Sequence, residues 1–368
     1  MRIVSLRVMV DSNLGMVTND MTSKSRLENV MIVSSNIIGK DQVQYTGGVV
    51  GYQSAASIYN IMIVSSNITG GKESIDVGGI VGFISRSKIK KVYVVSVIVS
   101  QFGLDGYNGQ DNHVGGVAGY GYGTDIQSVT VMDSIVHGSG VKRGGVVGLS
   151  DSDLLTDVNV IRTTISGFGS GNVYVGGVCG GVYNSDIQKA TVSSATIIAP
   201  QYGKIVYLGG GVGDFFGKTI ADLTVIDTVI TVGARKIIAG TRESIHVGGS
   251  VGFLSGTKGS RFMVINTTIN IEGNVQKGDV GLMAGNMQTN SSSVYILVSN
   301  SLININELND IYVGSGAGVM SESSIANFTI SNSILLFDGD GNIGSCIGSN
   351  KGGNNKCDFN EAIKSILP

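Results

Sequence analysis

Apolar residues recur along the chain in a register that is set by short glycine pentads. Ten five-residue segments have glycine at both ends, and successive pentads start 29 to 39 residues apart, with a mean of 33. Counted from the last glycine of each pentad, positions ten, twelve and seventeen carry apolar residues in all nine complete repeats. No gap is needed within this stretch in any repeat, so we expect the length variation to fall in loops before the next pentad.

The apolar spacing predicts strands rather than helices. Positions ten and twelve are two residues apart, which is the spacing of side chains on one face of a strand. Further Val and Ile residues stand at position seventeen and at five and seven residues before the last pentad glycine, for example Val173 and Val175. Each repeat is therefore expected to contain three short strands joined by bends. Val, Ile, Thr, Ser and Gly are poor helix formers, which argues against a helix in the repeat.

Stacking of equivalent repeats predicts the fold. One repeat cannot bury its apolar face alone, whereas a stack of repeats buries each column on the next. We therefore expect an all-β, right-handed parallel β-solenoid of about 10 to 11 coils, with roughly 33 residues per coil. The pentad glycines suit a bend where side chains would collide or where φ must be positive. These structural glycines are Gly47, Gly51, Gly78, Gly82, Gly115, Gly119, Gly144, Gly148, Gly176, Gly180, Gly209, Gly213, Gly248, Gly252, Gly281, Gly285, Gly314, Gly318, Gly344 and Gly348.

The repeat register also predicts the domain organisation. Residues 1–357 are expected to form a single solenoid domain, with degraded N-terminal coils over 1–46 and regular coils over 47–348. Residues 358–368 differ, because two acidic residues stand at capping-box spacing and the apolar residues fall on one side of a helix. A short helix over 358–368 is therefore expected to cap the open end of the last coil.

The glycine box and the residues after it resemble the GLUG repeat. Ranges such as Gly48–Gly51 and Gly79–Gly82 match its glycine box with Val or Ile in place of Leu, and Asn60 and Asn327 match a following Asn. The Ile that follows the box is matched by Ile58, Ile89, Ile126 and Ile187. This resemblance implies an adhesin-like β-helical repeat of the cell surface or of secreted proteins, and it implies no catalytic residues.

Composition and charge restrict the partners. The chain has 368 residues, with 56 Gly, 2 Pro and no Trp, and a net charge of −2 offers no basic field for nucleic acid. No apolar run approaches the roughly 18 residues that span a bilayer, so no transmembrane segment is expected. No signal-peptide core is present either, because Arg7 interrupts the first apolar run. Cys346 and Cys357 could pair, but reduced thiols are equally compatible with three cysteines in this chain.

No cofactor and no metal site is predicted. Glycine clusters such as 314–319 recur in every repeat and precede strand patterns, whereas a dinucleotide loop precedes a helix. His113 and His246 share a column four coils apart, roughly 19 Å by strand spacing, which is too far for one metal ion. These histidines and His137 are expected to be unrelated loop or edge residues.

The best candidate for binding is the outward face of the strand that contains positions nine to thirteen. This strip is flat, weakly charged and partly apolar, as interaction surfaces often are. Its position-eleven residues are Met62, Tyr93, Thr130, Asn159, Thr191, Thr224, Met263, Ile296 and Thr329.

Three functions are compatible with this pattern. The favoured hypothesis is a non-catalytic adhesive module, not an enzyme, that binds glycans or surface proteins outside the cell as a monomer or part of a longer array. The alternative is a carbohydrate-active β-helix enzyme, a polysaccharide lyase or glycoside hydrolase, with a cleft formed by loops 100–113 and 232–245. The third is a spacer without a ligand. No column of clustered carboxylates stands out, so no catalytic residue is assigned.

Overall fold

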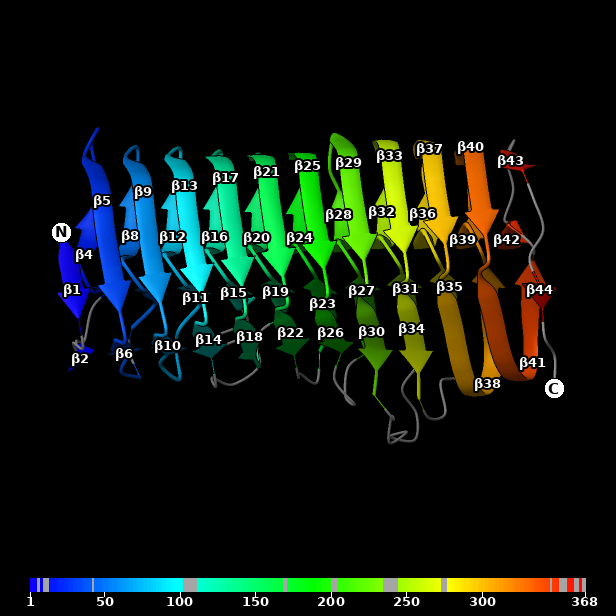
Figure 1. Ribbon diagram of the computed structural model, residues 1–368, viewed down its shortest axis with the longest axis horizontal. Helices are drawn as coiled ribbons and strands as arrows, with labels where there is room; N and C mark the ends of the chain where they lie inside the picture. Colours follow the sequence, from blue (N-terminus) through cyan, green and yellow to red (C-terminus); the bar gives the residue numbers. More distant parts are fainter. Residues whose placement is uncertain are drawn as a thin grey trace.

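The chain folds as a parallel β-solenoid, as the repeat pattern predicts. The computed structural model describes residues 1–4, 7–8, 13–41, 43–101, 111–139, 141–167, 171–199, 204–233, 244–272, 277–344, 346–350, 356–360 and 364–365. In Figure 1 the front strands run downward and the rear strands upward while the coils advance from left to right, which is a right-handed winding. Strands pair in parallel with their equivalents in neighbouring coils, and no helix occurs among the described residues.

The strands form four columns along the solenoid axis. Column one is a twelve-stranded sheet made of β1 (Arg2–Val4), β5 (Arg26–Val33), β9 (Ser57–Val64), β13 (Lys88–Val95), β17 (Asp125–Met132), β21 (Leu154–Ile161), β25 (Asp186–Ser193), β29 (Thr219–Ile226), β33 (Lys258–Ile265), β37 (Ser292–Ser299), β40 (Ser324–Ser331) and β43 (Lys356–Asn360). Column four is an eleven-stranded sheet made of β4 (Thr18–Met21), β8 (Val50–Ser54), β12 (Val81–Ser85), β16 (Ala118–Tyr122), β20 (Val147–Asp151), β24 (Cys179–Tyr183), β28 (Val212–Phe216), β32 (Val251–Ser255), β36 (Ala284–Gln288), β39 (Ala317–Met320) and β42 (Ile347–Asn350).

Columns two and three together form a 21-stranded sheet. Column two contains β2 (Arg7–Val8), β6 (Asn36–Ile38), β10 (Asn67–Gly70), β14 (Ile98–Gln101), β18 (Ile135–Gly138), β22 (Thr164–Gly167), β26 (Thr196–Ala199), β30 (Val229–Val232), β34 (Thr268–Ile271) and β44 (Lys364–Ser365). Column three contains β3 (Leu14–Gly15), β7 (Tyr45–Gly47), β11 (Asp76–Gly78), β15 (His113–Gly115), β19 (Lys142–Gly144), β23 (Val173–Gly176), β27 (Ile205–Gly209), β31 (Ser244–Gly248) and β35 (Gly278–Gly281). The longer strands β38 (Leu302–Gly314) and β41 (Ile334–Gly344) run through both columns.

Each regular coil thus has four strands, where the sequence predicted three. The additional strand is that of column four, which begins at the fourth pentad residue, as at Val50 and Val81. Its glycine-rich start was interpreted as part of a bend. The bend itself is shorter, because the pentad ends the column-three strand at its first glycine and starts the column-four strand three residues later.

The pentad glycines are required by close backbone contact rather than by backbone conformation. A Cβ atom on the first pentad glycine would lie 1.7 to 2.1 Å from the carbonyl oxygen three residues later. A Cβ atom on Gly116, a second pentad glycine, would lie 2.0 Å from the carbonyl oxygen of Gly145 in the next coil. Positive φ angles among the described glycines occur at Gly123 and Gly256, outside the pentads. The pentads therefore require glycine because a side chain there would collide with backbone atoms, which is one of the two reasons that the sequence suggested.

Every coil instead places a non-glycine residue in the left-handed region inside the column-one strand. These position-nine residues are Asn29, Asn60, Lys91, Ser128, Asp157, Lys189, Asp222, Arg261, Tyr295 and Asn327, with φ between 51° and 59°. Small polar residues tolerate this conformation best, which accounts for the many Asn, Asp and Ser residues in this column. Lys91, Lys189 and Arg261 are longer, and Tyr295 is the aromatic residue in this column.

One repeat contains an extra residue that the sequence alignment missed. In β37, Ile296 pairs with Phe262 and Leu297 pairs with Met263, so the register is one residue later than the gapless count predicts. The insertion lies in the preceding turn, where Thr289 and Asn290 both have positive φ. Ile296 is consequently 1% exposed in the core, and Leu297 takes the outward position that was assigned to Ile296.

The predicted C-terminal helix over 358–368 is wrong in the part of it that the structure describes. Residues 356–360 form β43, which pairs in parallel with β40, and residues 364–365 form β44, which pairs with β41. The exposed edge of the last coil offers unpaired backbone groups to these segments, whereas a helix of about ten residues is marginal by itself. The remainder of the predicted helix lies outside the described residues.

A ladder of buried hydroxyl groups closes the corner between columns four and one. Each rung accepts a hydrogen bond from a backbone N–H of the preceding coil, as Ser87 does from Ala56 and Ser185 from Asp153. Asp153 itself is a rung, because its Oδ1 accepts a hydrogen bond of 2.7 Å from the backbone N–H of Thr124. Burial is the largest effect on this carboxyl and raises its pKa to about 7. The space for it exists because Gly121 has no side chain.

Substitution of a pentad glycine should destabilise the fold strongly. We expect Gly116→Ala to lower the free energy of unfolding by at least about 2 kcal/mol, because the methyl group collides with a backbone carbonyl that cannot move alone. The control is Gly171→Ala, since a Cβ atom there has no neighbour within 4 Å. Chemical denaturation would measure both variants. Equal midpoints for them would contradict the steric role of the pentad.

The buried Asp153 carboxyl should make stability depend on pH. Its pKa is about 7 in the folded chain and near 3.9 when unfolded, so between pH 4 and pH 7 the folded state holds one more proton. The stabilisation is complete below about pH 4 and is lost as pH rises, at up to about 1.4 kcal/mol per pH unit. Asp153→Asn should flatten this slope, whereas Asp133→Asn, at an exposed carboxylate, should not. Thermal unfolding at several pH values measures how steeply stability changes with pH. Equal slopes for the wild type and both variants would contradict a raised pKa of Asp153.

Candidate active site

The outward-facing residues of columns three and four contact each other across the pentad bend along the solenoid. We call this line of contacts the seam. Column three contributes the residue two before each first pentad glycine: Tyr45, Asp76, His113, Lys142, Tyr174, Tyr207, His246 and Asp279. Column four contributes the residue after each last pentad glycine: Tyr52, Phe83, Tyr120, Leu149, Gly181, Asp214, Phe253 and Asn286. Tyr183 and Phe216 follow two residues later on the same outward face of column four.

Aromatic rings fill the seam in two rows. In the first row the rings of Tyr52 and Phe83 stack with centroids 5.3 Å apart, and Tyr120 meets Phe83 edge-on at 5.3 Å. In the second row Tyr174 and Tyr207 stack at 4.7 Å. Other members of this row are Tyr183, Phe216, His246 and Phe253, with neighbouring centroids 5.0 to 5.9 Å apart. Such rings, partly exposed along a line, suit stacking against flat faces of a bound molecule.

Two of the buried carboxyls in the seam have histidine partners. His113 Nδ1 lies 2.6 Å from Asp76 Oδ1, and both side chains are almost fully buried. His246 Nδ1 lies 2.8 Å from Asp279 Oδ2, which also accepts a hydrogen bond of 2.6 Å from Asn286. These histidines are therefore not the unrelated edge residues that the sequence suggested. Among the described residues, no group of three or more His, Cys, Asp or Glu side chains is placed to hold a metal ion.

Asp214 differs from the other seam carboxyls. It is 2% exposed, yet its Oδ1 has no hydrogen-bond partner among the described residues. Burial, the largest effect, raises the pKa of Asp214 to about 7, although the charge of Lys142 and a hydrogen bond from Tyr183 lower it. A carboxyl in such surroundings keeps its proton near neutral pH and is able to transfer it. Asp214 lies in the second aromatic row, where burial, and to a lesser degree the Asp214 charge, raises the pKa of Tyr174, Tyr183 and Tyr207.

Lys142 connects Asp214 to a second, exposed carboxylate. The Lys142 side chain lies beside Gly181, where a Cβ atom would come within 2.9 Å of its Cδ. Its Nζ lies 2.5 Å from Asp111 Oδ2 and 5.1 Å from the centroid of the Tyr174 ring. Half of the Asp111 side chain is exposed, whereas that of Lys142 is only 5% exposed. The pair of carboxyls, one buried and one exposed, thus faces a single lysine between aromatic rings.

Two of the solved structures that resemble this chain are catalytic domains. One is the catalytic domain of a GH87 alpha-1,3-glucanase in complex with tetrasaccharides, with 11% identity over 91% of this chain and 54% of that chain, and a TM-score of 0.35. Another is the catalytic unit of a thermostable GH87 alpha-1,3-glucanase from Streptomyces thermodiastaticus strain HF3-3, with 12% identity over 94% of this chain and 64% of that one, and a TM-score of 0.23. The chain spans little more than half of the first neighbour. At this level of similarity the likeness concerns the fold alone.

No family model and no curated protein matches the sequence. The resemblance to the GLUG repeat therefore stays a prediction. The prediction of a non-catalytic adhesive module, and with it the prediction that the chain is not an enzyme, is contradicted in that both neighbours are catalytic domains of GH87 alpha-1,3-glucanases; at 11% and 12% identity this likeness assigns no activity to the chain. That prediction rested on the lack of a carboxylate column, and the carboxyls of the seam come from two columns and a loop. No helix among the described residues is long and apolar enough to cross a membrane.

The predicted binding face lies elsewhere, on the outer surface of column one. Eight of its nine position-eleven residues pair in register there, among them Tyr93, which is 43% exposed, and Thr224. The ninth, Ile296, is in the core. The loops 100–113 and 232–245 of the enzyme alternative lie largely outside the described residues, but Asp111 and His113, at the end of the first loop, belong to the candidate site.

The sequence contained a signal for the seam that was not followed. His113 and His246 share a column, but the distance between them excludes only a shared metal ion. The same column contains Asp76, Lys142, Asp279 and three tyrosines, an unusual density of chemistry for one position of a repeat. Recognising Asp214 required the neighbouring column as well, and the contact between the two columns depends on the angle of the bend.

Proposed function

We propose that the chain is a carbohydrate-active enzyme, a glycoside hydrolase that binds a polysaccharide along the seam and cleaves it beside Asp214. The observation that supports this proposal most is the buried Asp214 carboxyl, which has one oxygen without a partner and stands in a row of aromatic rings. Glycoside hydrolysis commonly uses one protonated carboxyl as acid and one carboxylate as base or nucleophile. Asp214 and Asp111 have these two characters, and a polysaccharide substrate suits a protein that acts outside the cell.

The two carboxyls take complementary roles in the proposed reaction. Asp214 donates its proton to the glycosidic oxygen as the bond from that oxygen to the anomeric carbon breaks. A water molecule adds to the anomeric carbon, and Asp111 takes the proton that this water releases. Lys142 stabilises the Asp111 carboxylate before the reaction, and its positive charge also favours the Asp214 carboxylate that the reaction leaves. Proton exchange with solvent then restores both groups.

The aromatic rows supply the binding energy along the polymer. Tyr174 lies in the coil before Asp214, Tyr207 in its own coil and Phe253 in the coil after it, so a chain that follows the solenoid axis meets rings before and after the cleavage point. Sugar rings present apolar C–H faces to such side chains and direct their hydroxyls sideways to polar groups. His246, Asp279 and Lys142 stand at these positions in the same seam.

Asp214→Asn should abolish hydrolysis, because the amide has no acidic proton to transfer. We expect the release of reducing ends from a panel of polysaccharides, including α-1,3-glucan, to fall at least about 100-fold, which is the usual contribution of a general acid. Asp133→Asn is the control, since this exposed carboxylate pairs with Arg162 at the corner between columns one and two. An unchanged rate in Asp214→Asn, or products with unsaturated ends typical of a lyase, would contradict the proposal.

The pH dependence of the reaction should identify the acid. The Asp214 pKa of about 7 predicts that the rate falls tenfold per pH unit above about pH 7, as the acid loses its proton. Lys142→Met removes a charge that lowers this pKa, so the alkaline limb should move to higher pH. Rate profiles against pH for both proteins on the same polysaccharide measure the limb. If the rate of Lys142→Met falls over the same pH range as that of the wild type, the acid is a group other than Asp214.

A further inference from the structure

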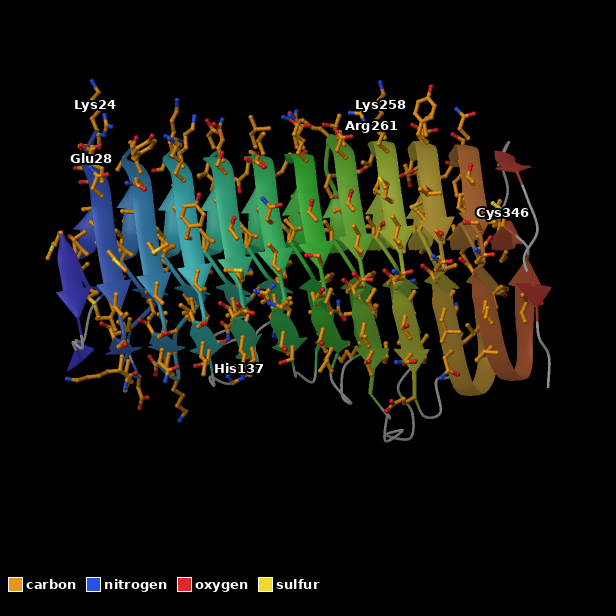
Figure 2. All side chains as sticks on the ribbon, in the orientation of Figure 1. Lys24, Glu28, His137, Lys258, Arg261 and Cys346 are labelled. Atoms are coloured by element: carbon orange, nitrogen blue, oxygen red, sulfur yellow. The ribbon has the colours of Figure 1, made fainter. Side chains whose placement is uncertain are left out.

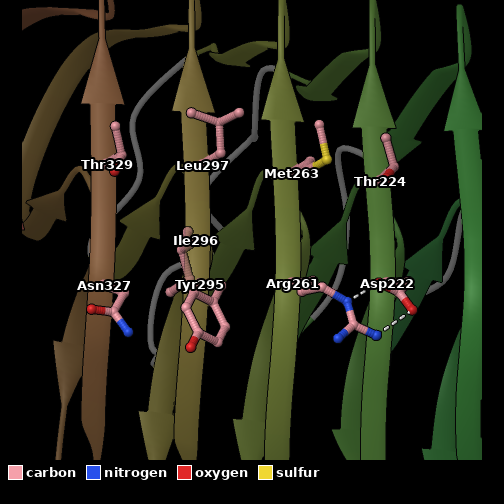
Figure 3. Close-up of a pocket in the computed structure, with 9 residues that line it drawn as sticks. All are labelled: Asp222, Thr224, Arg261, Met263, Tyr295, Ile296, Leu297, Asn327 and Thr329. Carbon is pink, nitrogen blue, oxygen red and sulfur yellow. Dashed lines mark hydrogen bonds and ion pairs between the residues drawn. The ribbon is translucent and has the colours of Figure 1, made fainter.

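A hollow lies on the outer face of column one, away from the seam. Figure 3 shows its residues in two rows across β29, β33, β37 and β40. One row contains the position-nine residues Asp222, Arg261, Tyr295 and Asn327, and the other contains Thr224, Met263, Leu297 and Thr329. The hollow has a volume of about 480 Å³ and is open to solvent. Four of its lining residues, Thr224, Met263, Ile296 and Thr329, belong to the binding face that the sequence predicted, and of these Ile296 is buried.

Tyr295 is the unusual residue of this hollow. Its φ of 59° places a bulky aromatic residue in the left-handed region, where the equivalent residues of other coils are Asn, Asp, Ser, Lys or Arg. Non-glycine residues in this region cost free energy, and such outliers are concentrated at functional sites. The side chain gains nothing from burial, because Tyr295 is 62% exposed. Neither the backbone nor the core therefore accounts for a tyrosine here.

The polar groups around Tyr295 suit an uncharged ligand. Arg261 binds Asp222 through two hydrogen bonds, of which that from Nη2 to Oδ2 is 2.6 Å long, so the two charges compensate each other. The guanidinium keeps further N–H groups for donation, and Asp222 is a strong acceptor. Figure 3 shows the amide of Asn327 on one side of the Tyr295 ring and Arg261 on the other, with the apolar Met263 and Leu297 in the next row.

We infer that this hollow is a second glycan-binding site, in which a neutral sugar ring stacks on Tyr295 and donates and accepts hydrogen bonds at Arg261, Asp222 and Asn327. Because the strands of column one and the seam belong to different columns, the site would hold a polysaccharide apart from the cleavage point. The inference rests on the proposed function for the class of its ligand, a neutral polysaccharide. It concerns binding alone and includes no bond cleavage.

The test measures retention on insoluble polysaccharides with the hydrolytic step removed. Asp214→Asn protein and the double variant Asp214→Asn with Tyr295→Asn would be incubated with particles of insoluble glucans and chitin, and the bound fraction measured. We expect the additional Tyr295→Asn change to weaken retention about tenfold, as loss of an aromatic anchor does. The matched control adds Tyr93→Ala instead, because Tyr93 is another exposed tyrosine of column one that lies outside the hollow.

Thermal unfolding separates binding from folding. Asn tolerates the left-handed region better than Tyr, so Tyr295→Asn should leave the melting temperature unchanged or raise it while retention falls. Equal retention of Asp214→Asn with and without Tyr295→Asn, equal losses from Tyr295→Asn and Tyr93→Ala, or no retention on any particle would each overturn the inference. Failure of the proposed function shows differently, as wild-type protein that releases no reducing ends. Retention that depends on Tyr295 would then still establish the binding site.

Discussion

The close approach of backbones at the pentad glycines is the constraint on which the rest of the structure depends. At each bend, the carbonyl group three residues later lies where a Cβ atom of the first glycine would be. Where the next residue is also glycine, a carbonyl group of the following coil lies where the Cβ atom of that second glycine would be. Last pentad glycines face backbone atoms of the preceding coil at 2.3 to 2.6 Å. This contact sets the angle between columns three and four and holds successive coils in register. Because the angle brings two outward faces together, the same contact that shapes the solenoid also creates the seam.

The seam has an electrostatic character that an exposed strand face could not have. At the open corner between columns one and two, ion pairs such as Arg162 with Asp133 stay in water and contribute little. In the seam, neighbouring rings remove water from the carboxyls, and each buried carboxyl then needs a partner or a proton. Asp76 and Asp279 have histidines, whereas Asp214 retains a proton up to about pH 7. Along one edge of the solenoid, by contrast, Lys24, Lys258 and Arg261 extend into solvent, as Figure 2 shows.

The repeat pattern predicted the solenoid and most of its core, because columns of Val and Ile are a property of the sequence alone. It could not predict the fourth strand, the inserted residue before Ile296 or the C-terminal strands, since these depend on where the bend closes and which edge is left unpaired. The pair Lys142 and Arg143 illustrates the limit for the site. Strand alternation sends Lys142 to the seam and Arg143 into the core, where it is fully buried. Two adjacent basic residues in the sequence do not reveal that one of them pairs with Asp111 and that the other stands in the core, in register with Val114 and Val175 of the neighbouring strands.

In a repeat protein, each residue can be compared with the equivalent residues of other coils. A residue that differs from its equivalents indicates a function only where the surrounding structure does not accommodate the difference. Arg143 departs from a column of buried apolar residues, but Gly167 leaves the space that its guanidinium occupies, since a Cβ atom there would lie 2.0 Å from Nη1. Asp153 departs from a column of hydroxyl residues, but it keeps their hydrogen bond to the preceding coil. Asp214 and Tyr295 are compensated less fully: one retains a buried oxygen without a partner despite the hydrogen bond from Tyr183, and the other places an exposed ring on strained backbone. Stacking alone gives no reason for either residue, and the two proposed ligands would supply one for each.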